Sequence, residues 1–140
     1  MLSDEREIIN LCHAYAECLD RGDHRGVGSL FEHGRVCMFE RGEPSGAPHV
    51  GAEGVKAFYD ATGRLENGGP RTRHTITNVI LGIGDDGRSA TTRSYFTVLQ
   101  QAPEVPLQLI ASGRYFDTYG KIDGEWRFVE KLTHVDHWTR

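Results

Sequence analysis

The chain has 140 residues, of which 38% are hydrophobic and 26% charged, and its formal net charge is −4. This length and composition suit one folded domain, residues 1–140, with a single core. Because the chain has no excess of basic residues, we do not expect nucleic acid or anionic membranes as partners. No apolar run approaches the roughly 20 residues that cross a bilayer. The charged N-terminus is unlike a signal peptide, so we expect a cytoplasmic protein.

The cysteine count and the short motifs exclude several classes of chemistry. Cys12, Cys18 and Cys37 form no CxxC pair and are odd in number, so we expect small buried hydrophobes, not a disulfide framework. A nucleophilic cysteine is the alternative, but no neighbouring residues mark one. The chain has no HExxH, no Cys/His ligand spacing and no phosphate-binding glycine loop. We therefore expect neither a metal site nor a cofactor.

The first half of the chain carries helical patterns. Apolar residues spaced three and four apart predict a helix over residues 4–20, with Ser3 as its N-cap. Asp23 is a suitable N-cap for a short second helix that extends through Phe31. A third helix is predicted over residues 52–64.

Strand patterns dominate the second half. A first strand is predicted at residues 36–40, and the Gly- and Pro-rich residues 42–51 are expected to form a loop, as are residues 65–70. Hairpin signals at Asp86-Gly87 and Asp123-Gly124 separate later strands. These strands are predicted over residues 71–83, 88–101, 107–119 and 125–138. The order predicts an α+β fold, with helices packed on one face of a curved antiparallel sheet.

The strongest candidate for catalysis lies on the strand over residues 71–83. Side chains alternate along a strand, so His74, Ile76 and Asn78 are expected to share one face. An imidazole and an amide on an otherwise apolar face are typical of a pocket wall. The alternative for His74 is a core histidine whose hydrogen bonds are satisfied.

Asp20 ends the first predicted helix, beside its apolar stripe. The helix dipole disfavours a carboxylate at this end, which favours a functional or capping role over simple exposure. We expect Asp20 to hydrogen-bond His74 and to orient it as a general base. Tyr15, on the same helix, is expected to donate a hydrogen bond to a substrate oxygen that gains charge, unless it is only a core aromatic.

Asn78 and Phe58, the latter on the third predicted helix, are the other expected substrate contacts. The remaining histidines are weaker candidates. His134 and His137 are three residues apart on a strand, which places them on opposite faces and argues against a shared metal. Four further histidines fall on a helix, near helix ends or in loops: His13, His24, His33 and His49.

Five segments together resemble the SnoaL-like group of the NTF2-like superfamily over nearly the whole chain. Each segment is weak by itself, but their order and spacing are specific for the fold. They are residues 15–23, 51–54, 73–78, 113–117 and 123–127. The resemblance implies a cone-shaped, curved antiparallel sheet closed by three helices.

Within this superfamily, the chain is most similar to scytalone dehydratase and hexachlorocyclohexane dehydrochlorinase. These enzymes abstract a proton with a His–Asp pair during an elimination, without cofactor or metal. The resemblance implies that His74 is the base and Asp20 its partner. Two positions depart from the pattern: the dehydrochlorinase has a basic residue at Tyr15, and its late-strand arginine falls near Lys121 and Ile122.

The expected function is therefore a cofactor-independent lyase or isomerase for a small, mainly apolar cyclic substrate, with the 42–51 loop excluding water. Two alternatives stay open, because this fold serves many functions. A non-catalytic ligand-binding module predicts a closed or purely apolar pocket. A structural subunit, like a dioxygenase small subunit, predicts a large exposed sheet face. The resemblance also implies a homo-oligomer, either a dimer or a trimer.

Overall fold

The computed structural model describes residues 1–62 and 71–139. The three helices precede the long strands, as predicted. Their bounds are α1 Asp4–Asp20, α2 His24–Leu30 and α3 Gly51–Ala61. The third helix is shorter than predicted, because Thr62 has an extended backbone with φ −118° and ψ 151°. The predicted loop over residues 65–70 lies outside the described residues.

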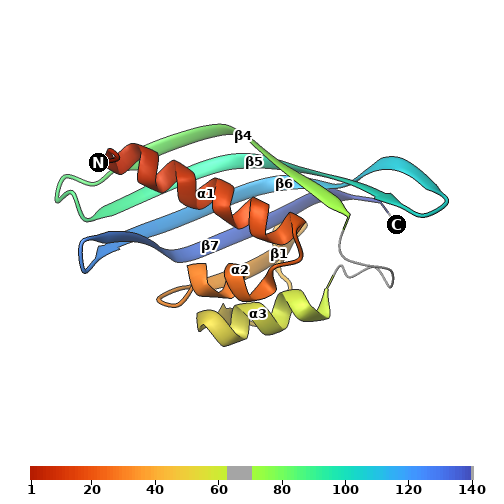
Figure 1. The fold of residues 1–140 in the computed structure, drawn as a ribbon, viewed down its shortest axis with the longest axis horizontal. Coiled ribbons are helices and arrows are strands. Elements are labelled where there is room, and N and C mark those ends of the chain that lie inside the picture. Colours follow the sequence, from red (N-terminus) through yellow and green to blue (C-terminus); the bar gives the residue numbers. More distant parts are fainter. Residues whose placement is uncertain (63–70, 140) are drawn as a thin grey trace.

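The strands form one curved sheet in the order β2-β1-β7-β6-β5-β4 (Figure 1), with β3 also paired to β1. The four long strands are the predicted antiparallel meander, and β1 joins β7 in parallel. The strand bounds are β1 Arg35–Glu40, β2 Glu43–Pro44, β3 His49–Val50, β4 Thr72–Ile83, β5 Ser89–Ala102, β6 Val105–Ile122 and β7 Glu125–Trp138. The α+β prediction is confirmed.

The segment over residues 42–51 corrects one prediction. It was expected to hold no regular element, yet β2 and β3 are two-residue strands that pair with β1. Pro44 fits there because a proline is tolerated in a short edge strand, where its missing N–H is not needed by a neighbour.

Helix α1 packs on β4 and β7 and lies across the sheet (Figure 1). Ser3 caps its start by accepting a hydrogen bond from the Arg6 amide at 3.2 Å. Its N-terminal end is fixed by Asp4, which accepts hydrogen bonds from Trp126 Nε1 at 3.0 Å and Lys121 Nζ at 3.2 Å. The bond from Trp126 is the main reason that the pKa of Asp4 lies below its usual value.

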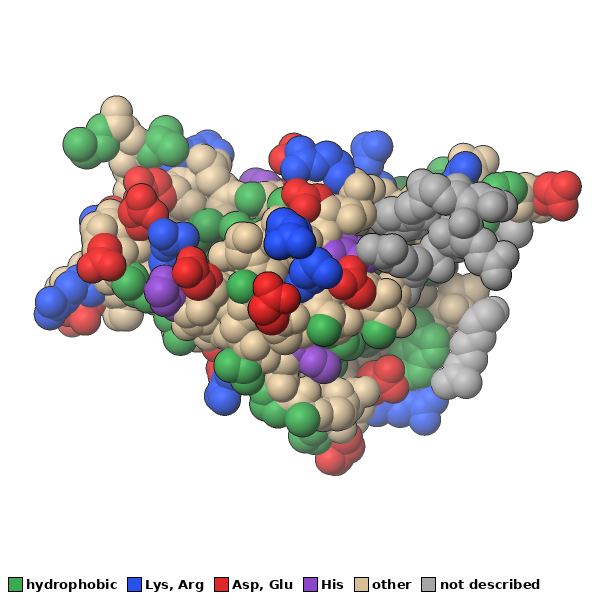
Figure 2. Space-filling model, turned by 60° about the horizontal axis from the view of Figure 1, so that its bottom comes forward, with side chains coloured by type: hydrophobic (Ala, Val, Ile, Leu, Met, Phe, Trp, Pro, Cys, Tyr) green, Lys and Arg blue, Asp and Glu red, His purple; other side chains and the backbone are tan. Residues whose placement is uncertain are grey.

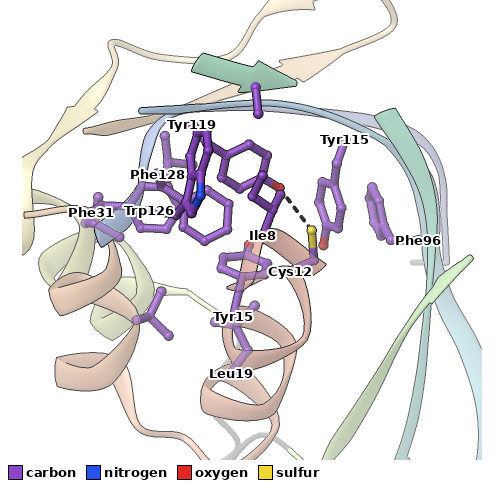
Figure 3. Close-up of a cluster of buried hydrophobic side chains, with 14 of the residues drawn as sticks. Ile8, Cys12, Tyr15, Leu19, Phe31, Phe96, Tyr115, Tyr119, Trp126 and Phe128 are labelled. Atoms are coloured by element: carbon purple, nitrogen blue, oxygen red, sulfur yellow. Dashed lines mark hydrogen bonds between the residues drawn. The ribbon is translucent and has the colours of Figure 1, made fainter. Parts of the chain in front are cut away.

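The core between α1 and the sheet is rich in aromatic rings (Figure 3). Phe31 stacks on Phe128 with ring centroids 4.7 Å apart, and Phe96 stacks on Tyr115 at 4.4 Å. Cys12 is buried, as expected, and its Sγ lies 2.9 Å from the hydroxyl of Tyr119. Burial raises the pKa of this thiol. These contacts favour a packing role for Cys12.

A buried ion pair lies within this aromatic core. Lys131 is 0% exposed and donates to both carboxylate oxygens of Asp117, at 3.1 and 3.2 Å. Its ammonium also lies 3.6 Å from the ring centroid of Tyr115 and 4.2 Å from that of Tyr15. Cation–π contacts and the carboxylate together replace the water that the ammonium loses on burial.

Strand β4 contains a bulge that changes which residues face the core. Its pairing with β5 shifts between Thr77 and Ile80, and Asn78 adopts a left-handed φ of 57°. Beyond the bulge, the more buried positions continue at Val79 and Leu81. The prediction that Asn78 shares a face with His74 is therefore wrong, because an inserted residue reverses the alternation.

The charged side chains on the face shown in Figure 2 are of both signs and interspersed. Among the described residues, no helix is long and apolar enough to span a membrane.

We predict that Lys131→Met destabilises the protein by about 3–5 kcal/mol, because the Asp117 carboxylate is left buried without its cation. Equilibrium urea unfolding measures this loss. The double variant Asp117→Leu/Lys131→Met should recover much of it, since both charges are then absent. Arg21→Gln is the matched control, since its ion pair with Glu17 is exposed, and it should change stability by less than about 0.5 kcal/mol. Equal effects of Lys131→Met and Arg21→Gln would contradict the prediction.

Candidate active site

A cavity of about 230 Å³ lies between the helices and the sheet. The helices contribute Tyr15 and Leu19 from α1, His24 from α2 and Tyr59 from α3. The cavity is mostly apolar, with a few polar groups, which is the usual make-up of a small-ligand site. The remaining lining residues are Met38, Thr62, Thr72, His74, Phe96, Val98, Gln100, Ile110, Ala111, Tyr115, Thr133 and Val135. None of the lining residues comes from the 42–51 segment, which was expected to shield the site.

The structure brings Asp20 and His74 together, with His74 on the wall of this cavity. The His74 ring nitrogen Nδ1 lies 2.6 Å from Asp20 Oδ1. The carboxylate also accepts the His74 backbone N–H, at 2.9 Å to Oδ2, and the Thr72 hydroxyl at 3.0 Å. Both side chains are largely shielded, at 15% exposure for His74 and 16% for Asp20.

This bonding fixes the orientation of the imidazole. A carboxylate is only an acceptor, so Nδ1 carries the proton that it shares with Asp20. In the neutral imidazole, Nε2 is then the basic nitrogen. Within residues 1–62 and 71–139, no hydrogen bond occupies Nε2 of His74. The arrangement therefore matches the geometry of a general base with an orienting carboxylate.

The pKa of Asp20 reflects the same contacts. Burial raises it, but the hydrogen bonds from the His74 ring and amide and from Thr72 outweigh burial, so the pKa falls below its ordinary value of 3.8. The carboxylate at the end of α1 is thus compensated by donors from β4, although the helix dipole disfavours it there.

Tyr15 lines the cavity, as predicted, and is paired with a residue that the sequence did not single out. Its hydroxyl lies 2.6 Å from that of Tyr59, and either oxygen is a possible donor. Burial raises the pKa of both phenols above the usual value, so they stay protonated. One proton of the pair lies outside their mutual hydrogen bond in either arrangement. The pair can therefore donate to a third oxygen.

Lys131 lies behind this tyrosine pair, with its ammonium over the rings of Tyr15 and Tyr115. Nothing in the sequence marked it, since a lysine on a strand is usually exposed. The Asp117 carboxylate, 3.1 Å from this ammonium, offsets its charge.

Two predicted substrate contacts do not line the cavity. Phe58 stacks on His49 with centroids 4.0 Å apart, and its neighbour Tyr59 faces the cavity instead. The helical phase of α3 decides this, because adjacent helical residues point about 100° apart. Asn78 is exposed and lies beside Arg93 and Tyr95 on the opposite face of the sheet, as the bulge requires.

A second His–carboxylate pair lies on the same cavity. His24 is 7% exposed, and its Nδ1 is 2.9 Å from Oδ1 of Asp60. The other oxygen of Asp60 accepts a bond from Lys56 Nζ at 2.7 Å. The bond from Lys56 is the main cause that lowers the pKa of Asp60 to about 2. No short sequence spacing joins residues 24 and 60, so only the packing of α2 on α3 reveals the pair.

The described residues contain no group of three or more His, Cys, Asp or Glu side chains placed to hold a metal ion.

The fold and the cavity define a small α+β domain with a ligand-sized site between helices and sheet. The SnoaL-like domain family matches residues 1–131. The chain therefore belongs to the SnoaL-like domain family, as the sequence resemblance implied. A search of curated proteins finds no match.

Solved structures share this fold. An NTF2-like protein with a cystatin-like fold from Novosphingobium aromaticivorans has a TM-score of 0.78 at 19% identity, covering 94% of this chain and 81% of that one. A candidate scytalone dehydratase from the same organism has a TM-score of 0.72 at 23% identity, covering 98% of this chain and 89% of that one. The β subunit of a candidate aromatic-ring-hydroxylating dioxygenase, also from this organism, has a TM-score of 0.74 at 18% identity. The match covers 96% of this chain and 90% of that one. These similarities establish the NTF2/cystatin-like fold and no particular activity.

We predict that Asp20→Asn lowers stability more at about pH 6 than at about pH 3. The pKa of Asp20 is lower in the folded protein, so the unfolded chain binds more protons between the two pKa values. The contribution of Asp20 to the free energy of unfolding is complete above its ordinary pKa. It is lost as the pH falls through the pKa that Asp20 has in the folded protein. Urea unfolding at both pH values measures the difference. Asp85→Asn, in the exposed β4–β5 turn, is the control, and a pH-independent effect of Asp20→Asn would refute the prediction.

Proposed function

We propose that this protein is a cofactor-independent lyase or isomerase that abstracts a proton from a small, mainly apolar cyclic substrate. The observation that carries the proposal is the Asp20–His74 pair on the cavity wall, with Nδ1 and Oδ1 2.6 Å apart. A structural role for His74 requires no such orientation toward a ligand-sized cavity.

In this proposal, Nε2 of His74 takes a proton from a substrate carbon next to a carbonyl. The Asp20 carboxylate holds the ring in the required tautomer and offsets the charge that the imidazole gains. General-base catalysis of this kind supplies about 10²–10⁴-fold in rate. The apolar walls contributed by Phe96, Val98 and Ile110 would hold the ring system of the substrate.

Removal of the proton places negative charge on the carbonyl oxygen. One hydroxyl of the Tyr15–Tyr59 pair is the proposed donor to that oxygen, because both phenols stay protonated and lie on the cavity while their mutual hydrogen bond uses one proton. Donors held in place before the reaction stabilise developing charge at little reorganisation cost.

The two other functions predict different behaviour. A binding module would take up the same ligands without reaction, and its cavity needs no oriented imidazole. A structural subunit would require a partner chain for its activity, and the resemblance to a dioxygenase β subunit is one of fold. The proposed homo-oligomer, through the outer face of the sheet, is compatible with any of the three.

We predict that the protein accelerates hydrogen–deuterium exchange at C2 of 1-tetralone, a compact cyclic ketone, in deuterated buffer. Exchange requires only proton abstraction and return, so it reports on the base without requiring the natural leaving group. His74→Gln should slow the catalysed exchange by about 10²–10⁴-fold, and Asp20→Asn should slow it in the same direction by misorienting the ring. Proton NMR of the ketone measures both rates.

His13→Gln is the matched control, because His13 is an exposed imidazole on α1. It should leave the exchange rate unchanged. Binding of 1-tetralone without exchange above that of buffer would overturn the enzyme proposal in favour of the binding module. Equal exchange by wild type and His74→Gln would remove His74 as the base.

A further inference from the structure

We propose that Thr133 determines which ligands the cavity selects: its hydroxyl hydrogen-bonds an oxygen substituent of the ligand, remote from the carbon that gives up its proton. This inference rests on the proposed function, because it takes the ligand of the cavity to be a cyclic ketone. It adds a second polar group to that ligand and narrows its class to cyclic ketones that carry a hydroxyl on the far part of the ring system. No step of the reaction is assigned to Thr133.

The Thr133 hydroxyl is a buried polar group without a partner. The residue is 5% exposed, and no group in the part of the chain that the structure describes hydrogen-bonds its Oγ1. Most buried hydroxyls in folded proteins are bonded, because burial otherwise removes their hydrogen bonds to water without replacement. A valine has nearly the same shape and would avoid this cost. The unpaired hydroxyl therefore points to a partner that is not part of the protein.

Thr133 lies on the sheet side of the cavity. It stands on β7, on the same face as buried Lys131, and is one of the residues that line the cavity. Its neighbours across the sheet, Met38 on β1 and Tyr115 on β6, line the cavity too. A rotation of about 120° around χ1 moves the hydroxyl into the place of the methyl group. The oxygen can thus take whichever of the two places meets a ligand.

Thr133 and His74 are far apart along the sheet. Two strands, β5 and β6, separate β7 from β4 (Figure 1). Neighbouring strands lie about 4.8 Å apart, so the three spacings amount to about 14 Å. The side chain of His74 and a ligand of two fused rings together span such a distance. A ligand that presents its C–H to His74 would therefore direct its opposite end toward Thr133.

Other polar groups on the cavity have partners within the protein. Thr72 donates its hydroxyl to Asp20 at 3.0 Å, and the hydroxyls of Tyr15 and Tyr59 bond one another. The Thr133 hydroxyl differs because its donor and its acceptor sites all remain for a ligand. A hydroxyl that both donates and accepts suits a hydroxyl of the ligand. A purely apolar ring end would leave it unpaired, so the site should discriminate against such ligands.

The test measures the binding of 1-tetralone and of its 5-, 6- and 7-hydroxy derivatives by isothermal titration calorimetry. These derivatives carry the hydroxyl on the ring that is remote from C2, at three different positions. The wild-type protein should bind one of them more tightly than 1-tetralone. Thr133→Val should weaken the binding of that derivative by about 3–10-fold and leave the binding of 1-tetralone unchanged. Thr133→Ser keeps the hydroxyl and should retain the preference.

Thermal unfolding of the variants gives a second readout. Thr133→Val should leave Tm unchanged or raise it, because the protein loses no hydrogen bond. Thr92→Val is the matched control: Thr92 is 3% exposed, is not among the residues that line the cavity, and its hydroxyl lies 2.7 Å from that of Tyr119. This control should lower Tm and retain the ligand preference. An equal fall in Tm for both variants would show that the Thr133 hydroxyl has a partner in the protein and would refute the inference.

Binding and deuterium exchange together separate this inference from the proposed function. A preference that Thr133→Val abolishes, in a protein that does not catalyse exchange at C2, would support the role of Thr133 and remove the enzyme proposal. A preference that Thr133→Val retains, or one that the wild-type protein lacks, would overturn the role of Thr133, while exchange that depends on His74 would still support the enzyme. Failure of all four ketones to bind would overturn both.

Discussion

The hydrogen bonds to the Asp20 carboxylate are the contact on which the site depends. They join the last residue of α1 to β4 through the Thr72 hydroxyl, the His74 amide and the His74 ring. Together with Asp4 at the other end, this carboxylate fixes α1 across the sheet. One side chain thereby joins the end of α1 to β4 and orients the imidazole. Structure and proposed chemistry share the same three donors.

The interior of the domain divides into two polar layers within an apolar frame. Deep in the core, Asp117 and Lys131 satisfy one another under the rings of Tyr15 and Tyr115. At the cavity lie the tyrosine hydroxyls and the rings of His24 and His74, each bonded to a carboxylate. The rings of Tyr15 and Tyr115 lie against the ammonium of this ion pair and also line the cavity.

The sequence predicted the helices and long strands well where the signal is local. The spacing of Ile8, Cys12 and Leu19 defined α1, and the hairpin turns defined the meander. The meeting of Asp20 with His74 was also predicted, partly from the unfavourable place of a carboxylate at a helix end. The face of β4 on which Asn78 lies was predicted wrongly, because a one-residue bulge reverses the alternation of side chains. The pattern of apolar and polar residues along a strand does not indicate where such a bulge lies.

The sequence by itself determined the long helices and strands and the α+β class, because periodicity and turn residues act over a few positions. The order and spacing of five segments also indicated the SnoaL-like family. Only the tertiary structure decided which polar groups share the cavity. Tyr59 in place of Phe58 follows from the packing phase of α3, and His24 meets Asp60 only because α2 lies against α3. Contacts between residues far apart in the chain carry no spacing signal, since the fold alone sets their distance.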